Sequence, residues 1–144
     1  MYAQVMQFRG AFIAVLGFVV SSLGHVFGGI DMLLRTLLIF MAIDMVSGIV
    51  ASAVFKCSDK TETGRLSSKA GLKGLVRKGG CLTLVAIGVH LDILLGTNSL
   101  TRDALIIAFS LNELLSILEN MGRMGIKMPA PIINAIEILS KKQM

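Results

Sequence analysis

Four long hydrophobic runs, separated by short polar segments, dominate the pattern of the chain. They cover residues 10–29, 32–55, 79–96 and 104–121, and each is close to the 20 or so residues that a helix needs to cross a bilayer. Gly28 and Gly29 favour the end of the first helix, and Asp31 favours the N-cap of the second. The pattern predicts an all-α integral membrane protein, residues 1–144 forming a single domain with about four transmembrane helices.

Two shorter segments have the periodicity of amphipathic cytoplasmic helices. In residues 67–78, cations follow one helical line and apolar residues another, so this segment is expected to lie on the inner leaflet against anionic lipid headgroups. Its basic residues are Lys69, Lys73, Arg77 and Lys78. An ordinary solvated basic loop is the alternative. Pro129 and Pro131 end the fourth run, and residues 129–142 form the second amphipathic segment.

The distribution of positive charge predicts the orientation in the membrane. Basic residues are concentrated between the second and third runs, including Lys56, Lys60 and Arg65, which places this connection in the cytoplasm. Two spans on each side of it then place both termini in the cytoplasm. With this topology, all of the 14 Lys and Arg residues except Arg35 and Arg102 lie on the cytoplasmic side.

Composition supports the membrane assignment and narrows the chemistry. Hydrophobic residues make up 54% of the chain and charged residues 16%, too little polar surface for a soluble domain of this size. Cys57 and Cys81 are expected to be reduced thiols of a cytoplasmic segment. The first run has no small-residue cleavage site after it, so we do not expect a removed signal peptide.

Small residues form a stripe along the first run, at alternating spacings of four and three. The stripe consists of Gly10, Ala14, Gly17, Ser21, Gly24 and Gly28. Such stripes let membrane helices approach closely. Three interpretations stay open: packing against the other helices of the same chain, an oligomerisation face between subunits, or a first helix that lies in the interface. The last would leave three spans.

Polar and ionisable side chains interrupt the other runs, where they are costly unless paired or hydrated. These residues are Asp44, His90, Asp92, Asn112 and Glu113. Counted from the cytoplasmic ends of the runs, they lie at depths of roughly 13–18 Å, so we expect them to form one intramembrane polar layer. The layer could be hydrogen-bonded glue between helices, involving Asp44, Ser47 and Asn112, the lining of a water-filled lesion, or an ion relay. Glu119 and Arg123, four residues apart, are expected to form an interfacial ion pair.

Several classes of function find no support in the sequence. Phosphate-binding loops, nucleophile elbows and zinc-protease motifs are absent, and the two histidines are far apart with no metal-ligand spacing. We therefore expect no enzyme, no metal site, no cofactor and no nucleic-acid partner.

A set of short motifs occurs in a fixed order from about Gly24 to Leu139. They are Phe27-Gly28-Gly29-Ile30-Asp31, Asp44-Met45-Val46-Ser47-Gly48, the basic run from Ser67 to Lys78, the third-run Asp92, and Asn112-Glu113-Leu114-Leu115-Ser116-Ile117-Leu118-Glu119-Asn120-Met121-Gly122 followed by Gly125, Ile126 and Pro129. In this order they resemble the bacteriophage holins of the group that includes the clostridial toxin-secretion holins. Ile30 stands where an aromatic residue is usual.

The resemblance implies a function that the residue pattern alone does not. Such holins oligomerise in the bacterial cytoplasmic membrane and open non-specific lesions that release an endolysin or a large toxin. It implies a homo-oligomer, with an antiholin as a further candidate partner. A small ion- or proton-conducting subunit, or an antiholin-like accessory protein that makes no pore, are the alternatives.

Overall fold

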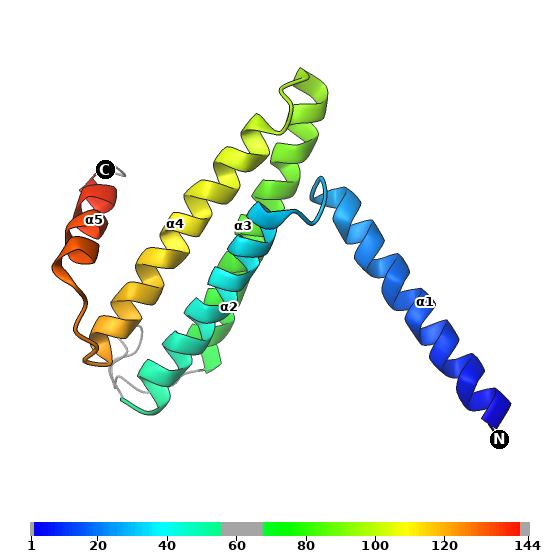
Figure 1. Ribbon diagram of the computed structural model, residues 1–144, viewed down its shortest axis with the longest axis horizontal. Helices are drawn as coiled ribbons and strands as arrows, with labels where there is room; N and C mark the ends of the chain where they lie inside the picture. The colour runs from blue at the N-terminus through cyan, green and yellow to red at the C-terminus, as the bar shows by residue number, and fades with distance from the viewer. Residues whose placement is uncertain (1, 56–67, 142–144) are drawn as a thin grey trace.

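The computed structural model describes residues 2–55 and 68–141, which form helices and short turns (Figure 1). The helices are α1 (Tyr2–Val26), α2 (Met32–Ala53), α3 (Ser68–Leu95), α4 (Leu100–Arg123) and α5 (Ala130–Lys141). Helices α1 to α4 are each long and apolar enough to cross a membrane. The prediction of an all-α membrane protein with about four such helices is confirmed. The loop cations Lys56, Lys60 and Arg65, and Cys57, lie outside the described residues.

Helices α2, α3 and α4 form a bundle in which α4 packs against both of the others (Figure 1). Every third or fourth residue of α2 points inward, and residues of α3 and α4 complete a small apolar core. The core consists of Leu34, Leu37, Met41, Val85 and Ile106. These five side chains are buried and pack against one another across the three helices.

Helices α3 and α4 come closest at Gly88. A Cβ atom at this position would lie 2.8 Å from Leu105 Cδ1 and 3.2 Å from the Arg102 Cα. A larger residue would therefore force the two backbones apart, as expected for a glycine that permits close helix packing. At Gly74 and Gly79, nearer the start of α3, a Cβ would have no neighbour within 4 Å.

Helix α1 stands apart from the bundle and slants away from the α1–α2 turn (Figure 1). None of its residues from Arg9 to Val26 is buried, and a Cβ at Gly10 or Gly17 would find no atom within 4 Å. From Gly10 to Gly24 the small-residue stripe therefore does not pack against α2–α4. Its last member, Gly28, does, since a Cβ there would lie 3.3 Å from Val89 and 3.4 Å from Arg102. Gly28 (φ +70°) and Gly29 (φ +109°) end the helix as predicted, and Asp31 caps α2 by accepting a hydrogen bond from the Leu34 N–H at 2.9 Å.

The third span differs from the prediction. We expected a separate amphipathic helix over residues 67–78 and a span over 79–96, but α3 is one continuous helix from Ser68 to Leu95. The reason is that only Gly79 and Gly80 separate the two segments. Glycine weakens a helix by about 1 kcal/mol, and here that cost does not interrupt α3. The basic segment is therefore a helical extension of the span.

Candidate functional site

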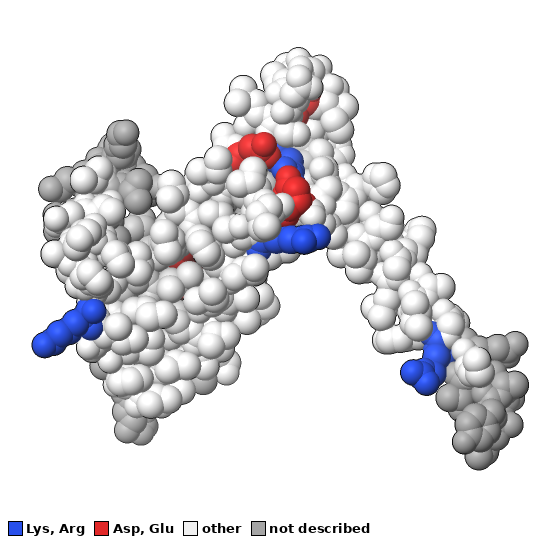
Figure 2. Space-filling model, viewed as in Figure 1, with Lys and Arg blue, Asp and Glu red and all other residues white. Residues whose placement is uncertain are grey.

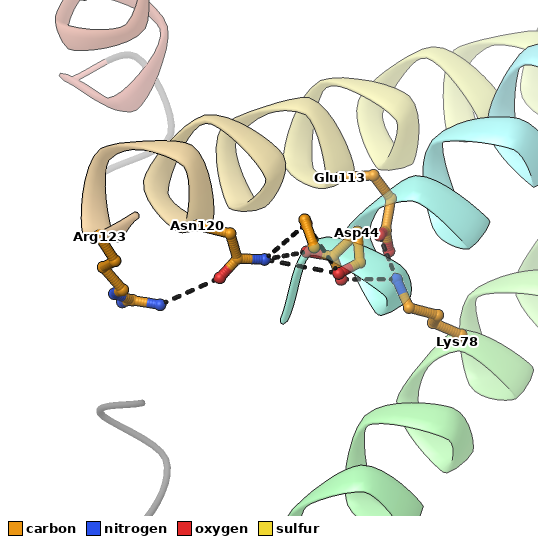
Figure 3. A network of polar contacts seen from close by, with 6 residues as sticks. Asp44, Lys78, Glu113, Asn120 and Arg123 are labelled. Carbon is orange, nitrogen blue, oxygen red and sulfur yellow. Dashed lines mark hydrogen bonds and ion pairs between the residues drawn. The ribbon is translucent and has the colours of Figure 1, made fainter. Parts of the chain in front are cut away.

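A buried charged group ties the three helices of the bundle together. The ammonium of Lys78, on α3, lies between the carboxylates of Asp44 on α2 and Glu113 on α4 (Figure 3). Its Nζ is 2.9 Å from Asp44 Oδ2, and it also donates to Glu113 Oε2. Asp44 and Glu113 are buried. One cation thus serves two acids, at a place where unpaired charges would be costly.

Asn120 continues this group toward the end of α4. Its side-chain amide donates to Asp44 Oδ1 at 3.1 Å and to Ser47 Oγ at 3.0 Å, and its own oxygen accepts from Arg123 Nη1 at 3.3 Å. Arg123 also forms the predicted ion pair with Glu119, at 3.7 Å. We call Asp44, Ser47, Lys78, Glu113 and Asn120 the inner polar cluster.

A second charged group lies where α1, α2 and α4 meet, near the turns. The Arg102 side chain is only 3% exposed. Its Nε donates to the Phe27 carbonyl at 2.7 Å and its Nη2 to the Gly29 carbonyl at 3.2 Å, while Nη1 donates at 2.8 Å to Asp31 and Asp103. Figure 2 shows blue and red atoms side by side on a face that is otherwise largely uncharged. The hydrogen bond from Arg102 lowers the pKa of Asp31 below its ordinary value.

Asp92 belongs to this second group through the start of α4. Its carboxylate accepts the backbone N–H of Thr101 at 2.9 Å and of Arg102 at 2.8 Å, and the Thr97 hydroxyl. It thereby satisfies N–H groups that the N-cap residue Ser99 leaves open, since Ser99 makes no side-chain cap hydrogen bond. We call Asp31, Asp92, Arg102 and Asp103 the outer polar cluster.

The predicted single polar layer is therefore two layers, and this corrects our expectation. Asp92 lies 14 residues after Lys78 on α3, which corresponds to about 21 Å, and the apolar core lies between the clusters. The depth count was wrong because it began α3 at residue 79, whereas the helix extends inward to Ser68.

Two predicted members of the layer lie outside both clusters. The His90 side chain is exposed and one ring nitrogen is 2.9 Å from the carbonyl of Ala86 on its own helix. Asn112 is also exposed. One of our three interpretations of the layer had Asn112 hydrogen-bonded with Asp44 and Ser47. Asn120 makes these bonds instead, because it lies on the buried face of α4.

Lys78, Arg102 and Asn120 were not predicted to be interior residues, although the sequence carries a signal for them. Lys78 is one and two heptads before the buried residues Val85 and Asp92, so all three share a face of α3. The same spacing argument applies to the inward face of α4, whose buried residues are Arg102, Ile106, Glu113, Ile117 and Asn120. Lys69, Lys73 and Arg77, in contrast, are exposed as predicted for a basic surface.

The clusters suit a structural role within one subunit better than bond-making chemistry. Each acid in them has a cation or N–H partner, and among the described residues no three His, Cys, Asp or Glu side chains are grouped so that they could hold a metal ion. The polar groups connect the helices at two levels, and an apolar core lies between them.

Comparison with known proteins gives a consistent family assignment. Residues 21–141 match the model described as the bacteriophage holin family. The chain is 43% identical to an uncharacterized protein of Listeria innocua over 90% of this chain and 86% of that protein. It is 32% identical to a 14.9 kDa protein of Clostridium perfringens, over 82% and 84% of the two chains. A protein of Bacillus phage phi105 named a probable holin is 27% identical over 80% and 78%. No solved structure matches the chain.

Proposed function

The chain belongs to the bacteriophage holin family, and on this premise we propose that it oligomerises in a bacterial cytoplasmic membrane and opens non-specific lesions there. The observation that carries the proposal is the family match, which covers residues 21–141 and so includes the whole α2–α4 bundle. The phage relative named a probable holin supports it.

The structure of one subunit supports a lesion that opens only after several subunits assemble. The inside of the α2–α4 bundle is filled by its apolar core and by paired polar side chains, so we place the lesion between subunits. Helix α1 is a candidate for that contact, because its small-residue stripe from Gly10 to Gly17 is not covered by its own chain and such stripes suit close helix association.

We place both termini and the start of α3 on the cytoplasmic side. The exposed cations Lys69, Lys73 and Arg77 then extend the third span into the inner headgroup region, where anionic lipids attract them. The outer polar cluster falls on the opposite side of the membrane, about 21 Å away by the rise of α3. The cargo of the lesion is an endolysin or a toxin, and an antiholin is a candidate regulatory partner.

Induced expression in a bacterium tests this function. The chain is expressed with and without a cytosolic endolysin that lacks a signal sequence, while membrane potential and culture turbidity are followed together. A holin gives abrupt depolarisation in both cultures and a collapse of turbidity only with the endolysin. Depolarisation without lysis would favour a small ion-conducting protein. If this chain instead delays the lysis that a second, co-expressed holin causes, an accessory, antiholin-like role would be favoured.

A further inference from the structure

Asn112 is an exposed polar side chain at the middle of α4, and with the proposed topology it faces lipid near the centre of the membrane. Asn112 lies 12 residues after Leu100 and 11 before Arg123, at the middle of the 24-residue helix α4, which is about 17–18 Å from either end. Its side chain is exposed. In the described part of the chain, no hydrogen bond to its amide is found, whereas Asn120 on the same helix is fully engaged.

An exposed amide at this depth points to a protein partner. Hydrocarbon offers neither donor nor acceptor, so both halves of the amide stay unsatisfied until another polar group arrives. Asparagine side chains form interhelical hydrogen bonds in membranes for this reason. The residues one and two turns before it, Ala108 and Ala104, are also exposed and small. A second helix could therefore approach closely enough for the amide to be reached.

We infer that the face of α4 formed by Ala104, Ala108 and Asn112 binds the same face of a second copy of this chain. We call it the α4 face. This inference rests on the proposed function and adds the contact surface of one subunit pair. The α4 face is separate from the small-residue stripe, which lies on α1 and consists of other residues.

Depth selects a second copy as the occupant. Copies inserted in the same orientation and related by an axis along the membrane normal carry Asn112 at the same height, and in a two-fold pair each residue can meet its own equivalent. An amide is self-complementary, because it has both a donor and an acceptor. The residues of α1 at this depth, around Ala14, are apolar. Thr83 of α3 lies at a similar height, but its hydroxyl already donates to the Gly79 carbonyl at 2.9 Å.

Disulfide cross-linking in intact membranes tests the α4 face. In a full-length chain with Cys57→Ser and Cys81→Ala, Ala108→Cys places one thiol on the face. The matched control is Ile107→Cys, one residue away on α4 and also exposed, but pointing about 100° around the helix. We expect oxidation to give a dimer at residue 108 and little at residue 107.

A second substitution tests the amide itself. Adding Asn112→Leu to the Ala108→Cys chain should lower the dimer fraction at limiting expression by roughly 3- to 30-fold, the range for one or two interhelical hydrogen bonds. Asn112→Gln should retain most of it. Immunoblots of the membrane fraction normalise for accumulation, so a variant that fails to insert is recognised.

The outcomes separate this inference from the proposed function. No dimer at residue 108 in a chain that inserts normally, equal dimer at residue 107, or a dimer that Asn112→Leu leaves unchanged would each overturn the α4 face, even if lysis is normal. A dimer at residue 108 that depends on Asn112 upholds the face even in a chain that causes no lysis, where the holin function would be the part that fails.

Discussion

Lys78→Met is the substitution that most strongly tests how the bundle is held together. Methionine keeps the length and volume of the side chain but removes the ammonium, so Asp44 and Glu113 lose their common cation. The side chains are 15% (Lys78), 11% (Asp44) and 8% (Glu113) exposed, so solvent cannot replace it. Removing one partner of a buried ion pair costs about 3–5 kcal/mol of unfolding free energy, and we expect a loss in this range.

Steric trapping of the purified protein in micelles measures this loss, because binding of a bulky protein to two attached labels is coupled to unfolding. Lys73→Met is the control, since Lys73 is exposed on the same helix and its replacement should change the unfolding free energy by less than about 0.5 kcal/mol.

A compensating variant checks that the loss comes from the unpaired acids. With Asp44→Asn and Glu113→Gln added to Lys78→Met, the cluster is neutral, and stability should return to within about 1–2 kcal/mol of the original chain, since a neutral, well-packed replacement of a buried pair is often tolerated. If Lys78→Met costs no more than Lys73→Met, the cluster does not hold the bundle together and the reasoning is refuted.

Three further predictions concern the remaining contacts. Asn120→Leu should lower the unfolding free energy by about 1–3 kcal/mol, because it strands buried polar partners; a change below about 0.5 kcal/mol would contradict the hydrogen bonds assigned to it. Gly88→Ala should lower the unfolding free energy by about 1–3 kcal/mol, because it overpacks α3 against α4. Gly79→Ala is in open space and should be neutral or stabilising by up to about 1 kcal/mol. Equal effects of the two substitutions in steric trapping would argue against a close crossing at Gly88. Arg102 lowers the pKa of Asp31 from 3.8. The stabilisation by this pair is therefore complete above the unfolded-state pKa and is lost as pH falls through the folded-state pKa. The unfolding free energy of the original chain should fall more steeply below about pH 4 than that of Asp31→Asn, and the two should change in parallel from pH 5 to 8.

The helices could be predicted from the sequence because each depends on local patterns. Runs of about 20 apolar residues, the glycine pair at the end of α1 and the aspartate cap of α2 are local signals, and the structure confirms four helices that could span a membrane. Family motifs in a fixed order indicated the function that residue chemistry alone did not.

The clusters could not be predicted in the same way because they depend on the vertical register between helices. Counting depth from the end of an apolar run placed Asp92 level with Asp44, but the actual register is set by Lys78, which reaches across from α3. From the sequence, a lysine at the edge of an apolar run is expected to contact lipid headgroups. The packed helices show that Lys78 is turned inward, and that Asn120 and not Asn112 is hydrogen-bonded inside the bundle.

Release of size-graded cargo from vesicles tests the central claim most directly. The purified chain is reconstituted at increasing protein-to-lipid ratios into vesicles that hold a small dye, a dextran and a folded protein of endolysin size. The account predicts that all three escape together above a threshold ratio, because lesions form between subunits and do not select cargo. Escape of the dye alone at every ratio would contradict it and would indicate a small conducting pore.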